Sequence, residues 1–162
     1  MSHFLRALCL AAALSSPAMA QQADIRFGGL QQDTTLPVEV TSDSLSVDQA
    51  SGAALFTGNV TAKQGDMRLT AETIRVEYSA DGEGIDKLIA GGGVTLVSPT
   101  DAAEATDAVY TIATGNVVMT GNVLLTQGRA AISGERLTVN LTDGTGTMTG
   151  QVKTIFAPGG AP

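Results

Sequence analysis

The sequence predicts an all-β fold, an elongated antiparallel β-jellyroll or solenoid-like stack of about sixteen short strands. Three observations support this prediction. Apolar residues recur at every second position, a short glycine-containing motif returns along the chain, and bulky side chains are scarce. The first two predict strands in repeated layers, and the third predicts that the interior contains an open apolar groove.

Alternation of apolar and polar residues is clear in "AETIRVEY" (residues 71–78) and "GERLTVNL" (residues 134–141). A period of two with Val, Ile, Thr and Tyr is typical of a half-buried strand. Glycine-containing stretches such as "TGN", "KQGD", "ADGEG" and "TDGTG" separate the runs. We interpret these stretches as turns between antiparallel strands, and we expect no helix after residue 20.

One of these turns is repeated in register. Its four copies are separated by 34, 29 and 29 residues: Gly58-Asn59-Val60, Gly92-Gly93-Val94, Gly121-Asn122-Val123 and Gly150-Gln151-Val152. Glycine permits a positive φ, Asn tolerates the same region, and the Val restarts a strand. Each copy therefore predicts one layer of a stack in which a layer contacts mainly its neighbours.

The same register places a continuous set of apolar side chains on the inner face of the stack. We expect these residues to line the groove: Val60, Ile74, Val76, Tyr78, Val94, Leu96, Tyr110, Ile112, Val123, Leu125, Leu137, Val139 and Leu141. A simple packed core would account for the same face. Two Tyr, four Phe and no Trp are few large fillers, which favours an incompletely filled groove. The alternation is weak around residues 101–105, where the inward and outward faces stay undecided.

A stack that does not close leaves unpaired edges at both ends. We expect one edge near Val38 and Val40 and the other near Val152 and Phe156, and exposed edges invite the strand of another chain. The predicted organisation is a domain at residues 37–156, with flexible segments at residues 21–36 and 157–162.

The first twenty residues, "MSHFLRALCLAAALSSPAMA", predict a secretory signal peptide cleaved after Ala20. The apolar run is much shorter than the ~20 residues of a membrane-spanning helix. Arg6 and Leu8 do not fit the lipid-attachment box of a lipoprotein around Cys9. The mature chain is therefore expected outside the cytoplasm.

Cleavage removes the only Cys and the only His and leaves 8 basic and 16 acidic residues, a formal charge of −8. Without Cys or His the chain cannot form a disulfide, a Ser-His-Asp or Cys-His catalytic site, or a common zinc site. We expect no enzymatic activity, no metal and no cofactor. The acidic balance also argues against nucleic-acid binding, because phosphates are repelled.

Two long stretches resemble the OstA-like family of periplasmic lipopolysaccharide transport proteins. They are "VEVTSDSLSVDQASGAALFTGNVTAKQGDMRLTAETIRVEY" and "ATDAVYTIATGNVVMTGNVLLTQGRAAISGERLTVNLTDGTGTMTG", and the resemblance covers about residues 37–156. Each motif is weak alone, and the specific signal is their order. The inner-membrane member of this transport system keeps an N-terminal helix and the outer-membrane member adds a long barrel, and both fit this chain less well.

The resemblance implies a β-jellyroll whose apolar groove shields the acyl chains of lipopolysaccharide in the periplasm. It also implies head-to-tail self-association, and binding to inner-membrane and outer-membrane partners of similar fold. The negative charge would leave headgroups outside, where the residues able to contact them are Lys63, Arg75, Arg129 and Arg136. Ordinary solvated strand faces explain those four residues better. The alternative function is a structural β-repeat scaffold or filament protein with a packed interior.

Overall fold

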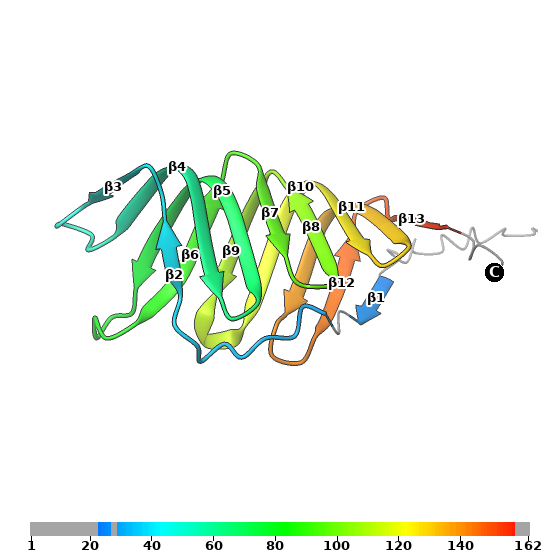
Figure 1. Ribbon diagram of the computed structural model, residues 1–162, viewed down its shortest axis with the longest axis horizontal. Helices are drawn as coiled ribbons and strands as arrows, with labels where there is room; N and C mark the ends of the chain where they lie inside the picture. The colour runs from blue at the N-terminus through cyan, green and yellow to red at the C-terminus, as the bar shows by residue number, and fades with distance from the viewer. Residues whose placement is uncertain (1–22, 27–28, 158–162) are drawn as a thin grey trace, which may run out of the picture.

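The computed structural model describes residues 23–26 and 29–157, which form one antiparallel sheet of thirteen strands. The strands lie side by side along the long axis of the molecule (Figure 1). They are β1 (Ala23–Arg26), β2 (Glu39–Thr41), β3 (Ser44–Val47), β4 (Ala54–Gln64), β5 (Met67–Tyr78), β6 (Ile85–Gly91), β7 (Val94–Val97), β8 (Asp101–Ala105), β9 (Asp107–Thr111), β10 (Asn116–Gln127), β11 (Ala130–Asn140), β12 (Thr145–Thr149) and β13 (Lys153–Phe156). The predicted signal peptide lies outside the described residues.

Four long strands give the sheet its shape, because each belongs to two surfaces. Residues 54–57 of β4 pair with β3, whereas residues 61–63 of the same strand pair with β2. β5, β10 and β11 change partners in the same way at their midpoints. The sheet therefore folds over on itself into two facing layers.

We call these layers half-sheet A and half-sheet B. Half-sheet A has the order β3, first part of β4, second part of β5, β6, β9, first part of β10, second part of β11, β12 and β1. Half-sheet B has the order β2, second part of β4, first part of β5, β7, β8, second part of β10, first part of β11 and β13. This arrangement is the predicted all-β jellyroll-like stack.

The repeated glycine motif forms the bends between the half-sheets. Gly58 and Asn59 have φ of 82° and 46°, and Gly121 and Asn122 have φ of 85° and 47°. Both pairs lie inside a continuous strand, at a register shift of the β4–β5 and β10–β11 ladders. The prediction of positive φ was right. The prediction of turns between strands was wrong for Gly58 and Gly121, because a β-bulge bends a strand without reversing it, whereas Gly92 and Gly150 do lie between two strands.

A side chain from a neighbouring strand, or from the connection between two strands, stands against each glycine of the motif. A Cβ added to the glycine would lie 2.6 Å from that neighbour in all four copies: Gly58 against Asp43, Gly92 against Glu72, Gly121 against Thr106 and Gly150 against Glu135. Backbone hydrogen bonds to three of these glycine carbonyls join the bends: Asp43 N–Gly58 O (2.9 Å), Thr106 N–Gly121 O (2.9 Å) and Glu135 N–Gly150 O (3.1 Å). The bends therefore form a row along one side of the molecule.

The bends also correct the predicted number of strands. From β2 to β13 the chain crosses between half-sheets eight times and reverses in seven hairpins, which together divide it into the expected sixteen short runs. Four of the crossings interrupt the strand, but at the other four, within β4, β5, β10 and β11, one strand continues from one half-sheet into the other. The sixteen runs therefore form twelve strands, and β1 makes the total thirteen.

The predicted domain boundary at residue 37 was also wrong. β1 pairs with β12, and Leu30 has no exposed surface. The Gln32 amide donates to the Leu141 carbonyl at 2.8 Å. Residues 23–26 and 29–36 are therefore packed on the domain. At the other end, the Ala157 amide donates to Arg129 O at 3.1 Å, and residues 158–162 lie outside the described part.

Within the described ranges, the only helical element is a single 3-10 turn at Ile112–Thr114, followed by Gly115 in the left-handed region. No described helix is long and apolar enough to span a membrane.

Replacing Gly121 by Ala tests the close approach at a bend. The new Cβ would lie 2.6 Å from Thr106 Oγ1, and the alanine would have to adopt a strained φ near +85°. Gly128 is a matched control, because it has φ +55° but nothing within 4 Å of its Cβ position. We expect Gly121→Ala to lower the free energy of unfolding by roughly 2 to 3 kcal/mol and Gly128→Ala by roughly 1 kcal/mol, measured by urea denaturation. Equal losses would contradict the steric role of the bend.

Candidate functional site

The interior between the two half-sheets is the candidate functional site. Eleven of the thirteen side chains predicted to line it expose 2% or less of their surface: Val60, Ile74, Val76, Val94, Leu96, Tyr110, Val123, Leu125, Leu137, Val139 and Leu141. Both half-sheets contribute, and these residues belong to one hydrophobic cluster. The structure thus brings together side chains that are up to 81 residues apart in sequence, from Val60 to Leu141.

Two predicted lining residues lie elsewhere. Tyr78 is 48% exposed, because it is the last residue of β5 and follows a register shift of the β5–β6 ladder. The prediction of Tyr78 as an interior residue was wrong. Ile112 lies in the 3-10 turn and packs against the cluster from its edge while partly exposed.

Within the part of the chain that the structure describes, the predicted groove is not open. The lining side chains with 0–2% exposure leave no solvent-filled channel beside these described residues. Small residues such as Ala62, Ala90 and Ala103 allow the half-sheets to approach closely, and buried methionines fill the remaining space. Met148 lies so close to Gly134 that a Cβ there would be 2.7 Å from its Cγ. The interior is therefore continuous, apolar and filled by its own side chains.

Two polar groups interrupt this apolar interior: Asp101 with Ser98 at the β7–β8 turn, and the pair of Gln64 and Tyr110. Gln64 ends β4 in half-sheet B, Tyr110 lies on β9 in half-sheet A, and both are 1% exposed. The Tyr110 hydroxyl donates to Gln64 Oε1 at 2.6 Å, and Gln64 Nε2 donates to the carbonyls of Thr34 (3.0 Å) and Leu36 (2.8 Å). Gln64 thus connects both half-sheets with the N-terminal segment.

Sequence reasoning missed Gln64. An alternating strand gives a buried Gln the same position as a buried Leu, and its partners at residues 34, 36 and 110 are distant in sequence. A weak signal was present, since Gln64 continues the inward alternation of Val60 and Ala62. Among the described residues, no buried side-chain polar atom is left without a partner.

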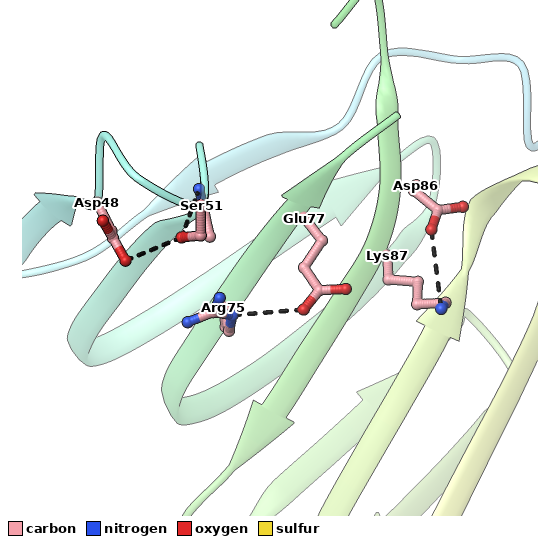
Figure 2. A network of polar contacts seen from close by, with 7 residues as sticks. Asp48, Ser51, Arg75, Glu77, Asp86 and Lys87 are labelled. Carbon is pink, nitrogen blue, oxygen red and sulfur yellow. Dashed lines mark hydrogen bonds and ion pairs between the residues drawn. The ribbon is translucent and has the colours of Figure 1, made fainter. Parts of the chain in front are cut away.

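The outer faces carry the charges. On half-sheet A, Arg75 Nε lies 3.4 Å from Glu77 Oε1, and Lys87 Nζ lies 3.8 Å from Asp86 Oδ2 (Figure 2). Figure 2 also shows Asp48 and Ser51 joined within the β3–β4 turn. The remaining cations named above, Lys63, Arg129 and Arg136, are exposed. Such solvent-exposed pairs contribute little stability, and they leave the cations accessible.

The described side chains of the site offer mainly apolar contact. Among the described residues, no three His, Cys, Asp or Glu side chains are grouped so that they could hold a metal ion. Two hollows of about 400 and 330 Å³ lie at equivalent bends, lined by Asn59 to Thr61 with Glu72 and by Asn122 to Leu124 with Glu135. Their polar lining suits water better than an apolar ligand.

The two ends of the stack present free strands. At one end β2 and β3 each pair only with β4, and at the other end β13 pairs only with β11. Phe156 is 75% exposed and Leu45 is 56% exposed, whereas Val38, Val40 and Val152 are half-buried. The predicted edges are present, but the prediction missed β3. It also missed that the free side of β12 is covered by β1.

The Gln64–Tyr110 bond gives a pH-dependent prediction. Burial raises the pKa of Tyr110 from 10.0 to about 12. The protonated Tyr110 hydroxyl therefore stabilises the fold fully below pH 10, and this contribution is lost as the pH rises toward 12. Tyr110→Phe leaves Gln64 Oε1 without its donor and should lower the free energy of unfolding by about 1 to 2 kcal/mol at neutral pH. Urea denaturation across the alkaline range should show the wild-type advantage shrinking between pH 10 and 12. A constant difference between the two proteins would contradict the assignment.

Comparison with known proteins agrees with this geometry. A protein of Rhizobium meliloti (strain 1021), described as uncharacterized, is 30% identical over 142 residues, which is 83% of this chain and 76% of that protein. The fold is similar to a crystal structure of LptH from Pseudomonas aeruginosa, with a TM-score of 0.71 and 17% identity over 78% of this chain and 99% of the other. LptH is described as the LptA-homologous periplasmic component of the conserved lipopolysaccharide transport device.

The match to a protein family is specific. The family described as "LptA/(LptD N-terminal domain) LPS transport protein" matches residues 39–145, about two thirds of the chain. The matched region begins with β2 and runs through both half-sheets to the start of β12. The chain belongs to the LptA/(LptD N-terminal domain) family of LPS transport proteins.

Proposed function

We propose that this protein is a periplasmic carrier, or one unit of a bridge, that shields the acyl chains of lipopolysaccharide and passes the lipid from the inner toward the outer membrane. The observation that supports this role is the apolar interior, which extends without a break from the β4 end of the stack to β12. It belongs to a chain of the lipopolysaccharide transport family.

The energetic reason for an apolar path is large. Each methylene removed from water contributes about 0.8 kcal/mol, so an acyl chain of about ten methylenes would cost roughly 8 kcal/mol if exposed. A lipid with several such chains cannot cross an aqueous compartment unless its chains stay covered. The inner faces of the half-sheets offer a covered path of the required chemistry.

Lipid binding requires the closed interior to open. The half-sheets are joined by continuous strands along the row of bends, whereas on the opposite side the strands of each half-sheet turn back in hairpins. We expect the two layers to separate along that side, so that acyl chains replace contacts between the inner side chains. The glycine bends act as hinges in this movement.

Charge favours a position for the headgroup outside the interior. The mature chain carries 8 basic and 16 acidic residues, and its inner faces are almost entirely apolar. Phosphorylated sugars would gain no compensation there for lost hydration. The acyl chains enter the protein, and the headgroup stays in water.

The end strands provide the docking surfaces of the bridge. β2 and β3 at one end and β13 at the other have unpaired backbone groups beside exposed apolar side chains. Pairing of one end with the opposite end of a second copy would continue the half-sheets across the junction. The same edges suit inner-membrane and outer-membrane partners of similar fold.

The filled interior favours a second candidate, a structural scaffold whose layers are only packed. Both functions are compatible with the same fold and with the same free strands at the two ends of the stack. They differ in whether the inner side chains ever contact lipid, which is the basis of the following experiment.

A diazirine amino acid at inner and outer positions of both half-sheets separates the two functions. Leu125 and Leu124 form a matched pair, because the first has no exposed surface and the second is 39% exposed. Val76 and its outward neighbour Arg75 form a second pair on half-sheet A. After irradiation of the folded mature protein with lipopolysaccharide, we expect adducts at positions 125 and 76 and few at 124 and 75. Adducts only at the outer positions would leave the scaffold function ahead.

Substitution of an edge residue tests head-to-tail pairing. Phe156→Asp places a charge on the free strand β13 and should weaken self-association about tenfold or more, measured by analytical ultracentrifugation. Leu124→Asp, on the face of half-sheet B away from the edge, is the control and should leave association unchanged. The proposed junction would be refuted by equal association of both variants, or by a wild-type chain that remains monomeric at every concentration.

A further inference from the structure

The side opposite the bends is closed by the chain's own N-terminal segment. Figure 1 shows this segment, coloured blue to cyan, running along one long side of the molecule between β1 and β2. Hairpin turns of half-sheet A line one margin of this side, and hairpin turns of half-sheet B line the other. We call the gap between the two margins the seam and residues 29–37 the cover.

The cover contacts both margins. On half-sheet A, the Gln32 amide donates to Leu141 O (2.8 Å), and Gln31 Nε2 donates to Thr142 O (3.1 Å). On half-sheet B, Gln64 Nε2 donates to two carbonyls of the cover, at Thr34 and Leu36. A segment that binds both margins holds the seam shut.

Glycines at the margins make room for this segment. Gly115 of half-sheet A is buried, and a Cβ there would lie 3.4 Å from Thr34 Cγ2. Gly65 of half-sheet B is exposed, and its Cβ position lies 2.9 Å from Gln32 Oε1. The β4–β5 turn is therefore shaped around the cover, whereas at Gly115 the cover lies at van der Waals distance and the closer neighbour is Thr142 Oγ1, at 2.5 Å.

Leu30 fills the space behind the cover. Its side chain has no exposed surface and belongs to the hydrophobic cluster of the interior. An aliphatic side chain that enters from the seam occupies the kind of space that the end of an acyl chain would take. The cover thus carries its own substitute for the lipid.

The bonds that hold the cover are few and reversible. Residues 29–37 contain no strand or helix, and most of them are exposed. Segments with few buried contacts open locally at low free energy. Gln64 is the main anchor, because a buried amide in an apolar interior is costly unless its hydrogen bonds are satisfied.

We propose that acyl chains enter through this seam and that residues 29–37 are its displaceable cover, latched by Gln64 and Tyr110. This inference rests on the proposed function. A lipid whose headgroup stays in water needs a slit along its direction of travel, and the row of bends closes the opposite side with covalently continuous strands. Displacement removes Leu30 from the interior and frees its place for lipid.

A reversible tether tests the cover directly. Gln31 and Thr142 are exposed neighbours across the seam, and the mature chain has no cysteine. In the double variant Gln31→Cys/Thr142→Cys, a disulfide should hold the cover on half-sheet A. We expect the oxidised protein to lose the lipopolysaccharide adducts at position 125, and reduction of the same sample to restore them.

A second staple controls for rigidity alone. Thr57 and Thr73 are partners across the β4–β5 ladder at the row of bends, so Thr57→Cys/Thr73→Cys crosslinks half-sheet A away from the cover. Its oxidised form should still take up lipid. Equal uptake by the oxidised and reduced tether would overturn the cover, whereas no uptake by wild type would refute the proposed function itself.

A lipid-free measurement keeps the two outcomes apart. Gln64→Ala removes the anchor, and the Gln32 amide should then exchange with deuterium about tenfold faster, because one net hydrogen bond of stabilisation is lost. Amides of the central strands, such as Val123, should change less. Uniform acceleration across the chain would indicate global destabilisation and contradict a local latch.

Discussion

The architecture depends on one backbone conformation, a pair of consecutive positive φ angles at each crossing from half-sheet A to half-sheet B. Gly58 and Asn59, Gly121 and Asn122, and Gly150 and Gln151 adopt it with nearly equal angles. The glycine is required for two reasons. Any other residue would have a strained backbone at that φ, and its side chain would collide with the neighbouring segment. Because the bends lie in one row, a single sheet supplies both walls of the interior. The opposite side is left to weaker contacts.

The closed interior and a lipid-carrying function are compatible if the interior is exchangeable. Its side chains are mostly Val, Leu, Ala and Met, without a large aromatic anchor other than Tyr110. Aliphatic and thioether side chains pack against an acyl chain as well as against one another, so replacement costs little specific bonding. The free energy needed to separate the half-sheets is then offset by burial of the acyl chains. The polar contacts of Gln64 are the part that lipid cannot replace, which places control of opening at the seam.

Much of the fold follows from the sequence, because local rules determine it. The alternation at residues 74–76 and 137–139 predicted strands, and the glycine motif predicted positive φ, both of which the structure has. The bends within strands could have been predicted from the sequence, but the interpretation of the alternation missed them. In β5 the inward positions change from Leu69 and Ala71 to Ile74 and Val76, with the polar pair Glu72-Thr73 marking the change of phase.

What the sequence did not reveal depends on contacts between distant segments. Nothing local distinguishes a cover such as residues 29–37 from a flexible linker, since its partners lie at residues 64, 115 and 141. The same applies to Gln64, whose role comes from three partners on other elements. The exposure of Tyr78 depends on its place at the end of β5, which alternation alone does not give.

The most direct test of this account is the distance between the two ends of one bent strand. Asp66 and Ala80 flank β5 in exposed turns on opposite margins of the seam. Spin labels at Asp66→Cys and Ala80→Cys, measured by double electron–electron resonance, should give one short distance in the free protein. Addition of lipopolysaccharide should shift the distribution to longer distances as the half-sheets separate. An unchanged distribution in a sample shown to contain bound lipid would contradict opening at the seam.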